Sequence, residues 1–502
     1  MDNVLDLNEE KVIIADDDSE VGNSFFETRY HGFKILVIVP SPSDEIATAG
    51  AMILNLTKAR SEIFVAFTNV NSNINKKVNT REIENSLNIL GVKKNHTIYL
   101  DSDDVADLKK LILEIEADVI FCIDFDILSV HQRLSTNFEQ AISEILLRTD
   151  NKYQPEIYKR FAYSIAFAAI QDLHSDNLLE TKRPLNFDLI DKANYIWSER
   201  VRFPVYENCR KTLILHNPIA KAMFGYKSQR NEWNTLGIIN SDEVFFERRT
   251  DNLIYTAEIS ATSGDFNKVR DFHIINTENI NENKTKFCNN LWEPDEDDRE
   301  RKLTLSWNKI QQIEQIKIYG DINAESENQL ILSLDDNFSS ELNLPKYGKP
   351  CIIDFPEMFF ASRAEIQLKS KAGIAEIEIF AKRESRHVIK PFIKITIDEN
   401  FIYDYFIPKS KNRIELEVYR FHTDQPLEMS VSDGVIYCSG KKFILQFDSD
   451  NVTVRAEISG ESEIFDQIKI HRKSSIYFWE LKLKQLIEKM NIYLRHKFKF
   501  LR

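Results

Sequence analysis

The feature of this sequence that most constrains its fold is a regular alternation of apolar runs and amphipathic stretches between residues 34 and 148. The apolar runs are rich in β-branched residues, which is typical of strands buried on both faces of a sheet. The stretches between them carry apolar residues at helical spacing. This pattern predicts an α/β domain with a Rossmann-like, mostly parallel sheet and helices on both faces. The predicted strands are KILVIV (34–39), EIFVAFT (62–68), HTIYL (96–100) and DVIFCID (118–124), and the predicted helices span 44–59, 80–91, 103–117 and 130–148.

Ligands of such sheets bind beyond the carboxyl ends of the strands. Gly91 is expected to end the second helix, and Asp103 or Asp104 to cap the third. Helices near 157–172 and 216–225 and a strand at 211–215 complete a first domain over residues 31–252, which follows a polar leader over residues 1–30. The strand ends that would form the site are 40–45, 68–70, 101 and 124–131.

From about residue 255 the apolar residues recur with a period of two, and polar breaks separate short runs such as KLTLSW, IEQIKIYG, QLILSLDD and AEIEIFAK. This pattern predicts a β-sandwich over residues 253–385. Residues 386–473 show the same period of two in FIKITID, RIELEVY, KFILQFD and NVTVRAEIS, which predicts a small immunoglobulin-like β-sandwich. The predicted fold is thus an α/β domain, two β-sandwich domains and a C-terminal helix over residues 474–502.

The predicted C-terminal helix has an apolar face and a basic, aromatic end. The apolar residues are Leu483, Leu486, Met490 and Leu494, and the end carries Arg495, Lys497, Lys499, Arg502, Phe498 and Phe500. Two interpretations stay open. The helix either makes peripheral contact with an anionic membrane surface, or it docks on the last sandwich with a solvated cationic end.

Charge and composition exclude several classes of function. A net charge of −14 argues against general nucleic-acid binding, which requires a basic face. The 13 glycines form neither GxGxxG nor GxxxxGK, which argues against phosphate-cradling loops. The five cysteines are scattered, as reduced thiols are, and the N-terminal residues lack a signal sequence. We therefore expect a cytoplasmic protein, with peripheral contact at the inner membrane face if the helix binds lipid.

Four short motifs follow one another at the ends of the predicted elements: PSPSDE (40–45), TNV (68–70), Arg81 and Glu84 before LG (90–91), and GYKSQ (225–229). Their order and spacing resemble the PIG-L (LmbE-like) family of zinc-dependent N-acetylglucosaminyl deacetylases, over roughly residues 33–250. In that family the first motif reads Pro/Ala-His-Pro-Asp-Asp-Glu, and the second histidine of a later His-Pro-Asp-His motif corresponds to His131.

The resemblance implies a zinc ion held by the first motif's histidine, its second aspartate and the later histidine, with the first aspartate as general base. Asp44 and His131 keep two of the ligand positions. Ser41 replaces the histidine ligand and Ser43 replaces the base. A hydroxyl is a poor zinc ligand and cannot act as a base near neutral pH, so the resemblance favours a weakly active or glycan-binding, scaffolding pseudoenzyme. The alternative is an active N-deacetylase of acetamido sugars with a rearranged metal site that uses Glu45, Asp124 or Asp126.

The implied partner is an amino-sugar glycan or glycolipid of surface-polysaccharide or glycolipid synthesis. Arg81 either grips a sugar hydroxyl or phosphate or pairs with Glu84, and Asn69 is a further candidate contact. KLTLSW, IEQIKIYG and GIAEIEIF resemble a discoidin (galactose-binding-like) sandwich, in which exposed aromatic side chains bind sugars. Trp292 is either such a side chain or structural, with Phe359 and Phe360 as weaker candidates, and the acidic run 295–300 is either a calcium site or a solvated loop.

Overall fold

The computed structural model describes residues 3–7, 13–14, 30, 32–58, 61–69, 80–124, 129–148, 153–161, 200–203, 217–229, 243–274, 290–335, 337–381, 391–397, 400–401, 404–421, 423, 425–439, 442–483 and 486.

The first domain is built on a seven-stranded sheet with the order β5-β4-β3-β6-β7-β9-β8. The first five strands in this order are parallel, whereas β9 runs antiparallel to both of its neighbours. The chain moves outward from β3 in one direction and then in the other, so the switch point lies between β3 and β6. The strands are β3 (Lys34–Val39), β4 (Glu62–Phe67), β5 (Thr97–Tyr99), β6 (Val119–Asp124), β7 (Glu156–Phe161), β8 (Arg200–Phe203) and β9 (Glu243–Arg248).

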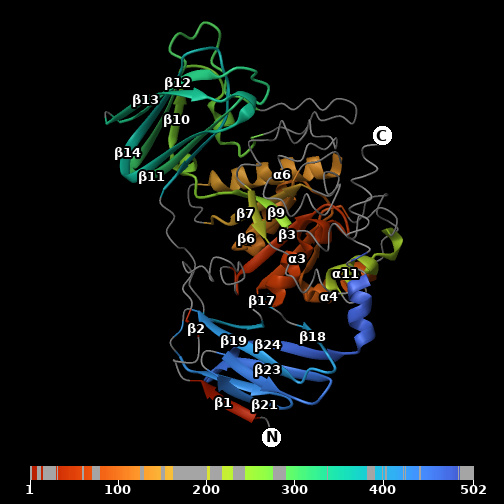
Figure 1. The fold of residues 1–502 in the computed structure, drawn as a ribbon. Coiled ribbons are helices and arrows are strands. Elements are labelled where there is room, and N and C mark those ends of the chain that lie inside the picture. The colour runs from red at the N-terminus through yellow and green to blue at the C-terminus, as the bar shows by residue number, and fades with distance from the viewer. Residues whose placement is uncertain are drawn as a thin grey trace.

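Helices cover both faces of this sheet (Figure 1), as the sequence predicted. One apolar cluster joins the sheet to α3 (Asp44–Lys58), α4 (Thr80–Leu90) and α11 (Pro218–Gly225). Another joins it to α5 (Val105–Ile115) and α6 (Ser129–Leu146). Gly91 ends α4 with φ of 91°, a left-handed conformation that suits glycine. Asp104 is the residue before α5, but its side chain makes no capping hydrogen bond.

The predicted helix near 157–172 is wrong at its start, because Glu156–Phe161 form strand β7, which pairs in parallel with β6. A short apolar run does not distinguish a buried strand from a buried helix, and here the pairing with β6 decides the conformation. The predicted helix near 216–225 is confirmed as α11, where the Asn217 side chain accepts the N–H groups of Ile219 and Ala220. The predicted strand at 211–215 lies outside the described residues.

The first sandwich is formed by two long bent strands and their partners. β11 and β14 pair with each other along most of their length, with register shifts between Ser306 and Gln311 and between Ile313 and Gln315. Such irregularities bend a strand, so both halves contribute to one core. KLTLSW and IEQIKIYG, predicted as separate strands, are therefore two parts of β11. The strands are β10 (Glu258–Ala261), β11 (Lys302–Gly320), β12 (Asn328–Leu334), β13 (Phe338–Leu344), β14 (Cys351–Leu368) and β15 (Ile374–Phe380).

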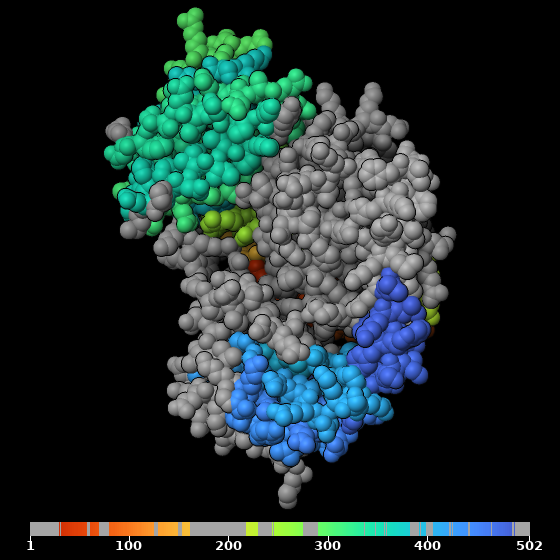
Figure 2. Space-filling model, viewed as in Figure 1, coloured from red at the N-terminus to blue at the C-terminus, as the bar shows by residue number. Residues whose placement is uncertain are grey.

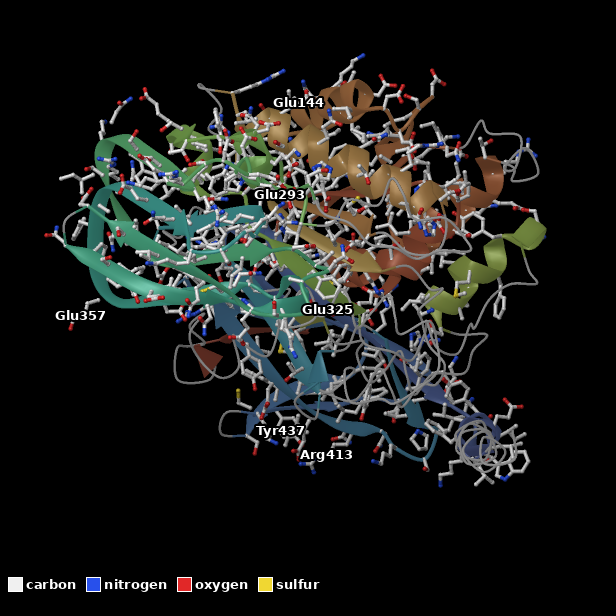
Figure 3. All side chains as sticks on the ribbon, turned by 90° about the horizontal axis from the view of Figure 1, so that it is seen from above. Glu144, Glu293, Glu325, Glu357, Arg413 and Tyr437 are labelled. Atoms are coloured by element: carbon white, nitrogen blue, oxygen red, sulfur yellow. The ribbon has the colours of Figure 1, made fainter. Side chains whose placement is uncertain are left out.

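The last sandwich consists of two sheets packed around an apolar core of its own. Figure 3 shows Arg413 and Tyr437 on its strands, while Glu357 lies at the outer edge of the first sandwich. The strands that follow β15 are β16 (Phe392–Ile397), β17 (Asn400–Phe401), β18 (Asp404–Pro408), β19 (Arg413–Phe421), β20 (Leu427–Val431), β21 (Val435–Ser439), β22 (Lys442–Gln446), β23 (Asn451–Ile458) and β24 (Glu461–Lys473).

Part of the predicted polar leader (1–30) belongs to this last sandwich. Strand β1 (Asn3–Leu7) pairs antiparallel with β20, and β2 (Ile13–Ile14) pairs in parallel with β19. Figure 1 accordingly places the N-terminus beside the C-terminal strands. Both segments contain β-branched or aliphatic residues that can complete a sheet edge, and the acidic residues around them hid this pattern.

Residues 475–483 and 486 are helical, which confirms the start of the C-terminal helix. Met490, Leu494 and the basic end lie outside the described residues. Within the part of the chain that the structure describes, no helix is both long and apolar enough to cross a membrane.

Candidate functional site

The PSPSDE motif forms a tight turn between β3 and α3, at the switch point of the parallel sheet. The Asp44 N–H donates to the Ser41 carbonyl at 3.1 Å, and the Ser43 carbonyl accepts the Ile46 N–H at 3.2 Å as the helix begins. Ser43 has φ of 84°, a left-handed conformation that costs a non-glycine residue about 1 kcal/mol. The turn thus places the motif at the carboxyl ends of the parallel strands.

Asp44 and His131 meet at this edge. His131 Nε2 lies 3.3 Å from Asp44 Oδ2, and both side chains are buried. The Ser41 N–H also donates to Asp44 Oδ2, at 3.1 Å. The structure therefore brings together the two residues that the resemblance assigned as remaining metal ligands.

The described residues around this pair do not fit a catalytic zinc ion. Such an ion takes three protein ligands of the His, Asp, Glu or Cys type, and the remaining two motif positions are Ser41 and Ser43. Among the residues described here, no three His, Cys, Asp or Glu side chains gather as a metal site requires. Asp44 and His131 instead form a polar pair with each other.

Glu45 is fully buried next to the pair and is held by Tyr226. The Tyr226 hydroxyl donates to Glu45 Oε1 at 2.6 Å, and burial raises the pKa of Glu45 to about 8. Its Oε2 has no hydrogen-bond partner, which favours the neutral acid. Sequence reasoning singled out the GYKSQ turn but not Tyr226, although a tyrosine beside a family motif was the available signal.

Asp124, at the end of β6, is neutralised by Lys159. The Lys159 ammonium lies 2.8 Å from Asp124 Oδ1 and also pairs with Glu139, while the Ser135 hydroxyl donates to Asp124 at 3.0 Å. Burial lowers the pKa of Lys159, but the two carboxylates outweigh this effect and raise it, so the group stays charged. Asp124 thus belongs to a buried ion cluster with Lys159 and Glu139. Asp126 lies outside the described residues.

The candidate substrate contacts of the first domain lie near the surface. Asn69 follows β4, and its N–H donates to the Pro40 carbonyl at 2.9 Å, which ties the two strand ends together. Arg81 is exposed on the first turn of α4. Glu84, its proposed ion-pair partner, lies 3.1 Å from Lys94. Asn69 thus contacts the PSPSDE turn directly, whereas Arg81 lies on the outer face of a helix.

Trp292 lies in the core of the first sandwich, which favours the structural one of its two interpretations over a sugar contact. Its side chain has no exposed surface, and its indole N–H donates to the Ser263 carbonyl at 2.9 Å. Phe359 packs against Phe338 and Phe355. Phe360 is the exposed member of the predicted aromatic set, with 51% of its surface accessible.

A cavity of about 280 Å³ opens at the acidic turn of this sandwich, lined by Pro294, Asp295, Glu296, Arg301 and Lys371. Lys371 Nζ lies 2.6 Å from Glu296 Oε1. Charged side chains of both signs thus line this cavity.

Asp298 fixes the shape of this acidic turn. It accepts hydrogen bonds from the hydroxyls of Ser263 and Thr262 and from the Arg301 N–H. These hydrogen bonds, of which the one from Ser263 has the largest effect, hold the pKa of Asp298 well below its usual range. The carboxylate is therefore engaged with the protein itself, in line with a structured loop rather than a calcium site.

No protein-family model and no curated protein matches this chain. Solved structures similar to its C-terminal β-sandwich region include the module CpGH89CBM32-6 of Clostridium perfringens, with 17% identity over 26% of this chain and 98% of that chain and a TM-score of 0.20. The family 32 carbohydrate-binding module of NanJ from Clostridium perfringens, in complex with galactose, has 16% identity over 25% and 93%, also with a TM-score of 0.20. The resemblance of the first domain to PIG-L deacetylases stays a prediction.

Proposed function

We propose that this protein is a non-catalytic, glycan-binding protein built on a deacetylase-like α/β domain. The observation that carries the proposal is the Asp44–His131 pair at 3.3 Å with serines at the two positions where the family has its third ligand and its base. A serine hydroxyl supplies neither a strong zinc ligand nor a proton acceptor near neutral pH.

Two neighbouring carboxyl groups that the structure describes, Glu45 and Asp124, are poorly suited to replace the missing ligand and base. Glu45 has a pKa of about 8 because it is buried, so it is largely protonated at neutral pH. Asp124 is paired with the Lys159 ammonium. The alternative function, a metal-dependent N-deacetylase of acetamido sugars with a rearranged site, has the preserved contact between Asp44 and His131 in its favour.

The glycan-binding part of the proposal rests on the cavity of the first sandwich. The Arg301 and Lys371 side chains offer donors for sugar hydroxyls or a carboxylate, and Asp295 and Glu296 offer acceptors. An amino sugar, with hydroxyls and an amide or ammonium group, complements such a mixed lining. We propose an amino-sugar glycan or glycolipid as the ligand and the cytoplasm as the location.

Metal content and acetate release test the first part of the proposal. The full chain, purified from zinc-supplemented medium, is expected to hold substoichiometric zinc and to release no acetate from acetamido sugars. The double variant Ser41→His/Ser43→Asp restores the family's donors and is expected to gain zinc. Stoichiometric zinc and acetate release in the unmodified protein would support the alternative function.

Glycan-array screening of the full chain tests the second part. The variant Arg301→Ala/Lys371→Ala is expected to lose the binding that the unmodified protein shows. Lys309→Ala, an exposed lysine of β11 that does not line the cavity, serves as the control and is expected to bind normally. Equal binding by both variants would mean that the glycan does not bind in this cavity.

A further inference from the structure

The C-terminal helix carries a stripe of exposed apolar side chains. Ile476 is 66% exposed, Trp479 63%, Leu483 39% and Leu486 54%. Their spacing of three, four and three residues places them on one face of a helix. Single exposed apolar residues are common, but four in helical register, including a tryptophan, make one side of this helix apolar.

The other side of the helix holds it on the last sandwich. Tyr477 is buried, and its ring packs 5.5 Å from that of Phe406 on β18, which in turn stacks on His471 of β24 at 5.1 Å. Figure 2 shows the segment, in dark blue, on the surface of the molecule beside the last sandwich. The helix is therefore docked through Tyr477 while the apolar stripe faces outward.

The charge of this segment is opposite to that of the protein. Residues 474–502 contain seven lysines and arginines and two glutamates, a net charge of +5, whereas the whole chain carries −14. An anionic surface would attract this end of the molecule and repel the rest. A second copy of the same helix would be repelled by like charge.

We propose that the stripe of Ile476, Trp479, Leu483 and Leu486 docks on an anionic lipid bilayer. The apolar face enters the boundary between headgroups and acyl chains, where tryptophan is favoured, and the basic residues contact lipid phosphates. Neither signal alone gives stable attachment, but an apolar face combined with a basic segment does. This inference does not depend on the proposed glycan binding.

Co-sedimentation of the full-length protein with vesicles tests the inference. The protein is expected to bind vesicles of phosphatidylcholine mixed with phosphatidylglycerol, and to bind phosphatidylcholine alone at least about tenfold more weakly. High salt should also weaken binding to the anionic vesicles, because it screens charge. The variant Trp479→Glu/Leu483→Glu is expected to lose binding by at least about tenfold, because it places two negative charges on the face that would enter the bilayer.

The matched control is Ile310→Glu/Val435→Glu. These residues are 69% and 56% exposed on the two sandwiches, so the control adds the same two negative charges at exposed apolar positions elsewhere. It is expected to bind vesicles normally. Equal vesicle binding by the two double variants would overturn the inference. So would a failure of the unmodified protein to bind anionic vesicles, whether or not sedimentation velocity shows a dimer that the helix variant disrupts.

Discussion

At the scale of single residues, Glu45 makes the stability of the first domain depend on pH. Its pKa of about 8 in the folded protein lies above the ordinary value of 4.5, so the folded state holds the proton more tightly. Stability is then lost as pH rises from about 4.5 to about 8, at a rate of at most about 1.4 kcal/mol for each pH unit between these values. Glu45→Gln removes this titration and keeps an acceptor for Tyr226.

We predict that Glu45→Gln unfolds at a temperature similar to the unmodified protein near pH 5 and at a higher temperature near pH 8. Thermal unfolding followed by circular dichroism across this range measures the difference. Glu114→Gln, on the exposed face of α5, is the control and should show no pH-dependent difference. Parallel curves for Glu45→Gln and the unmodified protein would contradict the raised pKa.

Lys159 pairs with two buried carboxylates, Asp124 and Glu139, and its replacement removes the ammonium group from both. We predict that Lys159→Met lowers the free energy of unfolding by about 3–5 kcal/mol, the usual loss when a buried ion pair is broken. Urea denaturation measures it. Lys109→Met breaks the more exposed pair with Glu144 and should cost less than about 1 kcal/mol. Similar losses in both variants would show that Lys159 is not a buried partner.

The residues of the candidate site differ in how far the sequence could predict them. Asp44 and His131 occupy motif positions, so their meeting at one edge of the sheet could be expected. Tyr226 lies 181 residues from Glu45, and Lys159 lies within a stretch predicted as helix. Contacts between such distant positions depend on tertiary packing, which local patterns do not encode.

At the scale of elements, helix α3 is kinked at Ala49, which has φ of −146° and ψ of 29°. The kink exposes two backbone N–H groups, and the buried carboxylate of Glu243 on β9 accepts both, from Ala51 at 2.8 Å and from Met52 at 2.9 Å. The Arg160 guanidinium lies 3.5 Å from the same carboxylate. Burial raises the pKa of Glu243, while Arg160 opposes this shift.

We predict that Glu243→Ala costs about 3–5 kcal/mol of stability, because it removes the carboxylate that pairs with the buried Arg160 and that accepts the N–H groups of Ala51 and Met52. Glu243→Gln keeps one acceptor oxygen and the side-chain shape, so its loss should be smaller. Urea denaturation compares the two variants. If alanine and glutamine are tolerated equally, the carboxylate does not hold the kink.

Element types were predictable where the apolar period was long and regular. The strands 34–39, 62–68 and 118–124 and the helices between them were confirmed, since period and length agree there. The kink in α3 was not predictable, because DEIATAGAMILNLTK has helical spacing throughout and the partner of the kink lies on β9. The prediction of a helix at the segment that forms β7 was wrong for a similar reason, since pairing with β6 decides its conformation.

At the scale of the whole molecule, distant parts of the chain complete one another. Strand β1 closes an edge of the sheet that β20, β23, β24 and β18 form, a pairing that a five-residue segment cannot reveal by itself. Strand β15 of the first sandwich is buried along its full length, because it packs between its own core and the segment that leads out of β9. The α/β domain and the first sandwich therefore share an interface.

Arg248, at the end of β9, lies at the centre of this interface. Its guanidinium is 3.5 Å from Glu378 of β15 and 3.9 Å from Glu139 of α6, and it stacks on the Phe272 ring at 4.2 Å. Glu376, also on β15, is fully buried, and neither of its carboxylate oxygens has a hydrogen-bond partner. Burial raises the pKa of Glu376 well above its usual value, so Arg248 compensates mainly Glu378 and Glu139.

We predict that Arg248→Met lowers stability by about 3–5 kcal/mol and separates the unfolding of the α/β domain from that of the first sandwich, since it leaves carboxylates buried on both sides of the interface. Scanning calorimetry should resolve the separation as a split transition. Adding Glu378→Gln removes one of the uncompensated charges, so the double variant should recover part of the loss, a coupling that a double-mutant cycle measures. Additive losses would mean that Arg248 and Glu378 do not interact, and an unsplit transition would mean that the two domains are joined by other contacts.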